Sequence, residues 1–227
     1  EFKGKLDIKK LFDRDFGKNN TIELHFETLG RNIQRFDYDF EAIDKNDPSL
    51  VRLKGKIEFN IETQPEMVDK NLILHDSSRR HYKINSESDN SSSAVVNFYS
   101  ETIHRDKTDQ QFRLILSDKK SDLHFEETII LPKIGEFRVM GIYPIERGDE
   151  RTLIIKFSDP VTRDEDITGF IQTEPYVKTD LIKQGNDIIV QGDYQYGTNY
   201  KILIKKGLRS KWNTKLNDDY FGDIKIS

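Results

Sequence analysis

The sequence predicts an all-β chain made of two tandem antiparallel β-sandwiches, and three observations carry this prediction. Short segments rich in β-branched and aromatic residues alternate apolar and polar side chains, which is typical of half-buried strands. Asn, Asp, Ser, Gly and Pro separate these segments, as expected of turns. Helical periodicity is nearly absent between them, which favours sandwiches over parallel sheets with crossover helices.

The first half of the chain contains several segments with this alternation. Thr21–Thr28 is typical, because Ile22, Leu24 and Phe26 occupy alternate positions and therefore share one face. The other candidate strands are Phe36–Ile43, Val51–Ile61, Asn71–His75, His81–Asn85, Ala94–Tyr99, Phe112–Leu116 and Leu123–Leu131.

The second half continues the same pattern. In Thr152–Phe157 we expect Leu153, Ile155 and Phe157 to face the core, since alternate residues of a strand point to opposite faces. The only segment with apolar residues at helical spacing is Leu6–Phe16, which is the one helix candidate. The remaining candidate strands are Phe137–Tyr143, Phe170–Thr173, Asp187–Gln191, Tyr200–Ile204 and Phe221–Ile226.

A weak internal repeat divides the chain into two similar halves. Lys56–Ile61 and Thr152–Phe157 are both alternating strands that are followed by a proline and by further apolar positions. Proline stiffens the chain and glycine permits a bend, so the segment between Pro132 and Glu136 is the expected joint. These features predict an N-terminal segment at 1–20, a first sandwich at 21–134 and a second sandwich at 135–227.

The composition excludes several classes of protein. A formal charge of −4 provides no basic face of the kind that nucleic-acid-binding proteins present. The chain has no cysteine, which excludes a disulfide-stapled secreted domain and leaves a cytosolic protein or a bacterial envelope module. No apolar run approaches the roughly 20 residues of a membrane helix, so we expect no direct membrane insertion by this segment.

Residues suited to catalysis or metal binding occur without the spacing that such chemistry needs. The five histidines lack metal-ligand spacing, and neither a Gly-x-Ser-x-Gly elbow nor a glycine-rich phosphate loop is present. Asp159 and the acids 164–166 offer loop oxygens for calcium, but Arg163 lies among them, and a solvated turn is the favoured interpretation. The sequence therefore predicts no catalytic, cofactor-binding or metal-ligating residue, and we expect no enzyme.

Three aromatic residues are the candidates for a ligand or interface site. Trp212 is the only tryptophan and stands between Lys211 and Asn213, in a segment expected to be a loop. Together with Tyr194 and Tyr196 it would form a stacking platform for a ligand. The competing interpretation is that Trp212 caps one end of its own sandwich.

The C-terminal half also contains a series of motifs that resembles a known family. The connector Ile130-Leu131-Pro132-x-x-Gly135-x-Phe137 is similar to the entry of a macroglobulin-like domain in bacterial alpha-2-macroglobulins. The likeness continues through the strand 153–157 with Ser158-Asp159-Pro160-Val161, then residues 166–171, then Gly207-Leu208-x-Ser210. It covers residues 130 to 227, and the first half shares it only through the internal repeat.

This resemblance implies Ig-like, macroglobulin-like sandwiches in the N-terminal scaffold portion of a bacterial alpha-2-macroglobulin-like protease inhibitor. In that family a protease cleaves a bait region, and a Cys-Gly-Glu-Gln thioester can then tether it. This chain contains no cysteine, so the thioester motif lies outside it. The implied partners are proteases, bound through the full-length protein, and downstream macroglobulin-like domains of the same chain. The implied location is the bacterial periplasm or cell envelope, with a lipid anchor upstream of Glu1.

The alternative from a different functional class is an Ig-like adhesin or glycan-binding module of the bacterial cell envelope. That function requires an exposed aromatic platform, for which Trp212, Tyr194 and Tyr196 are the candidates.

Overall fold

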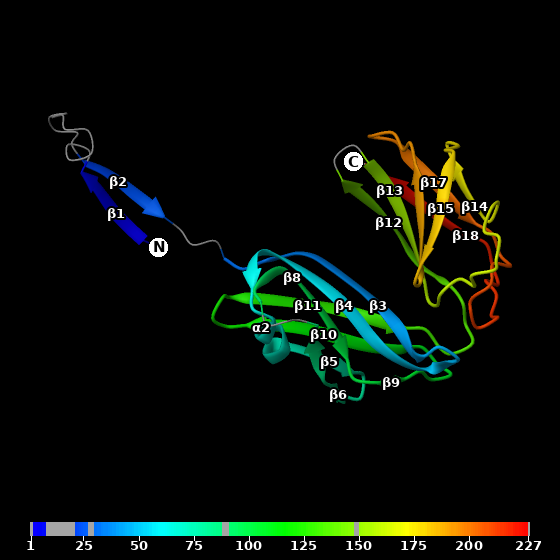
Figure 1. Ribbon diagram of the computed structural model, residues 1–227, viewed down its shortest axis with the longest axis horizontal. Coiled ribbons are helices and arrows are strands. Elements are labelled where there is room, and N and C mark those ends of the chain that lie inside the picture. Colours follow the sequence, from blue (N-terminus) through cyan, green and yellow to red (C-terminus); the bar gives the residue numbers. More distant parts are fainter. Residues whose placement is uncertain (1, 8–20, 27–29, 88–90, 148–149, 227) are drawn as a thin grey trace.

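The computed structural model describes residues 2–7, 21–26, 30–87, 91–147 and 150–226, and it confirms the all-β fold class (Figure 1). Every sheet in this part of the chain is antiparallel, and two hydrophobic cores form, one from residues 40–131 and one from residues 137–226. The strands of the two sandwiches run in clearly different directions (Figure 1). Within the described residues, no helix is long and apolar enough to cross a membrane.

The first sandwich consists of two facing sheets. One has the order β3-β4-β8-β7, with β9 paired to β4, and the other has the order β11-β10-β5-β6. The strands of the first sheet are β3 (Ile33–Asp44), β4 (Asp47–Thr63), β7 (Ile84–Ser86), β8 (Ser93–Ser100) and β9 (Ile103–His104). Those of the second sheet are β5 (Leu72–Asp76), β6 (His81–Tyr82), β10 (Gln110–Asp118) and β11 (Leu123–Leu131).

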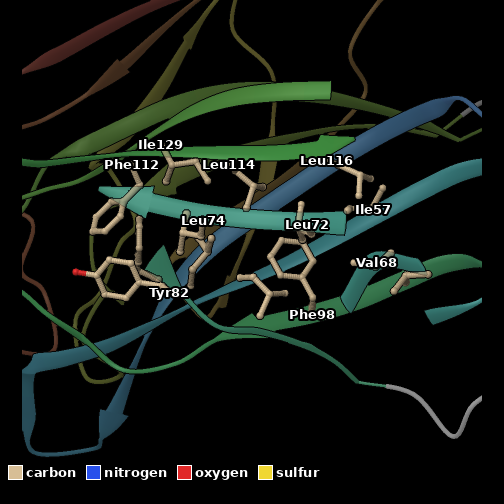
Figure 2. Packing of buried hydrophobic residues seen from close by; sticks show 14 of the residues in the cluster. Ile57, Val68, Leu72, Leu74, Tyr82, Phe98, Phe112, Leu114, Leu116 and Ile129 are labelled. Atoms are coloured by element: carbon tan, nitrogen blue, oxygen red, sulfur yellow. The ribbon is translucent and has the colours of Figure 1, made fainter. Parts of the chain in front are cut away.

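The core of the first sandwich follows from the alternation of its strands. Ile57 and Phe98 from one sheet meet Leu74 and Leu114 from the other, and all four side chains are buried (Figure 2). Gly55 lies directly opposite Phe98 in the β4–β8 ladder. A Cβ atom at position 55 would lie 2.2 Å from the Phe98 ring, so the aromatic ring occupies the space that a side chain would need.

The second sandwich repeats this arrangement with fewer strands. One sheet has the order β12-β13-β16-β15 and the other β14-β17-β18. Leu153, Ile155 and Phe157 are almost completely buried, which confirms the predicted phase of this strand. The strands are β12 (Val139–Arg147), β13 (Glu150–Phe157), β14 (Ile171–Glu174), β15 (Thr179–Gln184), β16 (Asp187–Gly192), β17 (Asn199–Ile204) and β18 (Tyr220–Lys225).

The N-terminal region contains a two-stranded sheet. β1 (Phe2–Asp7) and β2 (Thr21–Phe26) form an antiparallel hairpin in which Leu6 is opposite Ile22. The candidate strand at Thr21 therefore pairs with residues 2–7. Of the predicted helix Leu6–Phe16, the first two residues belong to β1, because Phe2, Gly4 and Leu6 alternate in phase with β2. Residues 8–16 of that prediction lie outside the described residues.

The sequence did not predict β1, the two-residue strand β9, the edge strand β15 or the short helix α2. β15 is an edge strand whose residues are half-buried or exposed, so it lacks the apolar alternation that marks the other strands. The short helix α2 (Pro65–Asn71) begins with a proline at its first turn, where the missing N–H costs no hydrogen bond, and it buries Pro65 and Val68. At seven residues, α2 is too short for a clear helical periodicity.

Candidate functional site at the joint between the sandwiches

The two sandwiches are joined by a buried ion pair between Arg105 and Asp159. Arg105 follows β9 in the first sandwich, and Asp159 follows β13 in the second. The guanidinium donates two parallel hydrogen bonds, from Nη1 to Asp159 Oδ1 at 2.5 Å and from Nη2 to Oδ2 at 3.0 Å. The side chains are only 2% and 6% exposed. A bidentate pair with this little solvent contact defines both the distance and the orientation of its partners.

The connector between the sandwiches contributes to the same network. Arg105 Nε donates to the carbonyl oxygen of Pro132 at 2.6 Å, and the backbone N–H of Arg105 donates to Ser49 O at 2.8 Å. The hydroxyl of Ser158 lies 2.9 Å from Asp159 Oδ2 and accepts a hydrogen bond from the Arg138 N–H at 3.1 Å. The guanidinium therefore links the first sandwich, the connector and the second sandwich at one point.

A second set of contacts links β3 to the second sandwich. Asn186 Nδ2 donates to Asp39 Oδ1 at 2.6 Å and to the carbonyl oxygen of Phe40 at 3.1 Å. Lys156 Nζ donates to the carbonyl oxygen of Tyr38 and lies 5.2 Å from the centre of the Tyr38 ring. Polar side chains of the second sandwich thus bind backbone oxygens on the outer edge of the first.

Burial at β3 raises the pKa of ionisable side chains on and near this strand. Burial raises the pKa of Asp39 to about 7, and the positive charge of Lys156 only partly offsets this effect. Burial also raises the pKa of Asp187, whose Oδ1 atom is buried without a hydrogen-bond partner among the described residues. Burial, together with nearby phenol and carboxylate groups, raises the pKa of Tyr38 to about 12.

These contacts border a cleft of about 550 Å³ between the sandwiches. β3 supplies one wall, β11 a second, and β12 with the end of β13 the third. A second hollow of about 610 Å³ lies on the first sandwich alone, bordered by α2 and β5–β7. The inter-sandwich cleft combines apolar walls, charged groups and strand edges, so it is the stronger candidate for a binding site.

The structure places the three aromatic candidates at different points. Tyr194 is 2% exposed and packs at a right angle against Tyr200 in the core. Tyr196 is 71% exposed, with the Arg151 guanidinium 5.8 Å from its ring centre. Tyr194 and Tyr196 follow β16, whose end pairs with the beginning of β13. Trp212 lies near the opposite end of β13, because the backbone N–H of its neighbour Lys211 donates to the carbonyl oxygen of Pro160. The three side chains do not form one surface.

Trp212 itself belongs to the joint. It is half-buried and borders a gap of only about 10 Å³ together with Phe40 and Pro48 of the first sandwich and Asp159 of the second. Lys211 Nζ lies 4.6 Å from the Trp212 ring centre. Trp212 therefore lies at one end of its own sandwich, as the competing interpretation expected, with the first sandwich next to it.

The expectation of a solvated acidic turn is wrong for Asp159. Asp159 is 5% exposed and carries the inter-sandwich ion pair, while Asp164 and Asp166 are exposed as expected. The local sequence of the turn is polar, but the partner that buries Asp159 comes from 54 residues earlier. Within the described part of the chain, no three His, Asp or Glu side chains are grouped closely enough to hold a metal ion.

Sequence reasoning did not identify Arg105, Asn186 or Lys156 as members of a site. A buried arginine has no local signature, since its neighbours in sequence are exposed polar residues. One signal was present: Pro132 and the Ser158-Asp159 pair belong to the motifs that carry the family resemblance, and all three residues take part in the joint.

Comparison with known proteins yields no family, and one of the similar solved structures is a distant match. No protein-family model and no curated protein matches this sequence. Among solved structures, the surface layer protein SbsC, domains 4–9, is similar over 91% of this chain with 7% identity and a TM-score of 0.31. The matched region covers 33% of that structure's chain, so the present chain spans about a third of the neighbour.

Proposed function

We propose that this chain is a non-catalytic framework segment that holds two β-sandwiches at a constant angle within a larger envelope protein. The buried Arg105–Asp159 pair is the observation that carries this proposal. An exposed linker would let the sandwiches reorient, whereas a buried bidentate pair separates only if both charges are hydrated or left unpaired. The expected role is therefore mechanical: to position what is attached at either end.

The proposed host is a bacterial alpha-2-macroglobulin-like protease inhibitor of the periplasm or cell envelope. The motif residues Pro132, Ser158 and Asp159 support this host, because their groups build the joint and the motif thereby acquires a structural purpose. In this proposal the full-length protein binds the protease, later domains continue the scaffold, and a lipid upstream of Glu1 anchors it.

Spin labelling tests the framework role directly. The chain has no cysteine, so Thr128→Cys and Asp180→Cys introduce two unique labelling positions, both exposed and on different sandwiches. We expect a single narrow distance distribution between the labels, and a broad one after Arg105→Met. The matched control is Arg113→Met, which removes the exposed ion pair with Glu126 and should leave the distribution narrow. A broad distribution in the otherwise unchanged chain would contradict a constant angle.

Sequencing the gene on both sides of this segment tests the proposed full-length protein. A lipid-attachment cysteine upstream and repeated sandwich domains downstream would support the inhibitor. The full-length protein should then be cleaved by a protease such as trypsin and should reduce its activity on protein substrates. A frame without further domains would contradict the inhibitor while leaving the framework role of the joint intact.

The adhesin or glycan-binding alternative rests on Tyr196 and Trp212 separately, since they share no surface. The exposed ring of Tyr196 is the observation that favours it. Titrating the chain with a broad panel of glycans while following tryptophan and tyrosine fluorescence tests this function. Trp212→Ala and Tyr196→Ala are the informative variants. A flat response across the panel would exclude glycan binding by these rings.

A further inference from the structure

Three strand edges surround the cleft between the sandwiches. β3 and β11 are terminal strands of the two sheets of the first sandwich, and β12 is a terminal strand in the second. All three contribute residues to the walls of the cleft. A terminal strand presents unpaired backbone N–H and C=O groups along its outer edge, and these groups can pair with another strand.

Side chains of the second sandwich form hydrogen bonds with only some of the backbone groups on the outer edge of β3. Lys156 binds the carbonyl oxygen of Tyr38 and Asn186 binds that of Phe40, so residues 38 and 40 direct their backbone groups outward. In an antiparallel ladder every second residue points the same way, so the backbone groups of Phe36 also face outward. Among the described residues, none provides a partner for the Tyr38 N–H or for the Phe36 N–H and C=O.

The walls next to this edge are apolar and partly open to solvent. Phe36, Tyr38 and Phe125 pack against the core but remain half-buried. Ile130 is 41% exposed and Tyr143 is 52% exposed, although both are large apolar side chains at a domain joint. An exposed apolar surface beside an unpaired strand edge favours a partner that brings both a backbone and apolar side chains.

The cleft walls carry three acids, Asp37, Asp39 and Glu127, and two cations, Arg35 and Lys156. Asp37 and Glu127 line it, and together with Asp187 they raise the pKa of the Tyr143 hydroxyl further than burial alone does. Arg35 pairs with Asp37 at 2.8 Å and Lys156 binds the Tyr38 carbonyl, so Glu127 is the wall carboxylate that no cation among the described residues pairs with. An incoming lysine or arginine side chain would therefore meet the Glu127 carboxylate, whereas an incoming acid would be repelled by it.

We propose that this cleft docks an extended segment of a partner protein, which pairs with β3 at Phe36 and Tyr38 and alternates apolar with basic side chains. The apolar side chains would contact Tyr143 on β12, and the basic ones would approach Glu127 on β11. The alternation follows from the geometry of an added strand, whose successive side chains point to opposite faces.

An end-capped octapeptide, Thr-Val-Lys-Val-Thr-Val-Lys-Val, carrying an N-terminal fluorophore is the probe. Fluorescence anisotropy with the 227-residue chain should show saturable binding with a Kd below about 1 mM. The backbone amide signals of Phe36 and Tyr38 should shift and become protected from hydrogen exchange, because both N–H groups gain a partner. A peptide with Glu at both Lys positions should bind more weakly, and one with N-methylated valines should not bind.

Charge-reversal variants of the protein test whether the peptide binds in the cleft or elsewhere on the surface. Glu127→Lys should weaken binding about fivefold or more, whereas the matched control Asp180→Lys should change it less than about twofold. Asp180 is also an exposed acid on a terminal strand, but β15 lies at the opposite edge of its sheet from the cleft. Absence of saturable binding, equal binding of the N-methylated peptide, equal loss in both variants, or amide shifts confined to residues outside β3 would overturn the proposal.

Discussion

At the scale of single residues, Arg105 shows how strongly burial determines the contribution of an ion pair to stability. The chain contains a matched comparison, because Arg113 and Glu126 form a pair on the surface while Arg105 and Asp159 form one in the joint. Exposed pairs contribute little, since water solvates both partners when they separate. A buried pair is different, because loss of one partner leaves the other charge without water or counter-charge.

We predict that Arg105→Met lowers the free energy of unfolding by about 3–5 kcal/mol, because Asp159 remains buried and unpaired. Arg113→Met should cost less than about 1 kcal/mol. Urea denaturation followed by circular dichroism measures both values. The double variant Arg105→Met with Asp159→Leu should recover much of the loss, since apolar side chains can replace a buried pair. Equal costs for the Arg105 and Arg113 variants would show that the joint pair is effectively solvated.

Asp39 predicts a pH dependence of stability. Its pKa is about 7 in the folded chain against 3.8 as the ordinary value, so between these pH values the folded state binds a proton that the unfolded state has released. The contribution of Asp39 to stability is therefore full below about pH 4 and is lost as the pH rises to about 7. Asp39→Asn removes this loss and keeps an acceptor oxygen for Asn186.

The measurement is the difference in free energy of unfolding between Asp39→Asn and the unchanged chain, at several pH values from 4 to 8. The variant should gain stability relative to the unchanged chain across this window and level off above about pH 7. Lys156 and Asp187 face the same space and stay constant in this comparison. A difference that is independent of pH would mean that Asp39 keeps an ordinary pKa.

At the scale of elements, the ladder between β4 and β8 depends on one glycine. Gly55 is buried in the middle of β4, where glycine is otherwise unfavourable, and the Phe98 ring from β8 lies over it. The ring and the missing side chain are therefore complementary, and each explains the other.

We predict that Gly55→Ala destabilises the first sandwich by about 1–3 kcal/mol, because the added methyl group overlaps the Phe98 ring. Thermal or urea unfolding measures the loss. Combining Gly55→Ala with Phe98→Leu should give a smaller loss than the sum of the two single changes, because the smaller side chain makes room for the methyl group. Strict additivity would show that the ring moves aside without strain.

At the scale of the whole molecule, the joint brings the two sandwiches into direct contact. Trp212 is the only tryptophan and lies at the joint, so its fluorescence reports contact between the sandwiches, while far-ultraviolet circular dichroism reports all strands. We predict that the two signals change at the same urea concentration in the unchanged chain. In Arg105→Met the fluorescence should change first, because the sandwiches separate before they unfold. Coincident transitions in that variant would contradict coupling through this pair.

The extent of the sequence prediction follows from which interactions are local. Leu153, Ile155 and Phe157 were assigned to the core correctly, because the period of two in a strand is readable within a few residues. β15 was missed because an edge strand with polar, half-exposed residues carries no such pattern. The helix predicted from Leu6 began in a strand instead, since a short apolar run fits both periodicities until its pairing partner is known.

The sequence alone determined that this chain forms strands and that they alternate toward two cores. Only the tertiary structure decided that Asp159 is buried, that Trp212 faces the first sandwich and that three strand edges surround one cleft. The physical reason is separation along the chain: Arg105 and Asp159 are 54 positions apart, and Asp39 and Asn186 are 147 positions apart. Burial and pairing at such distances depend on how complete sandwiches pack, which no local pattern of residues records.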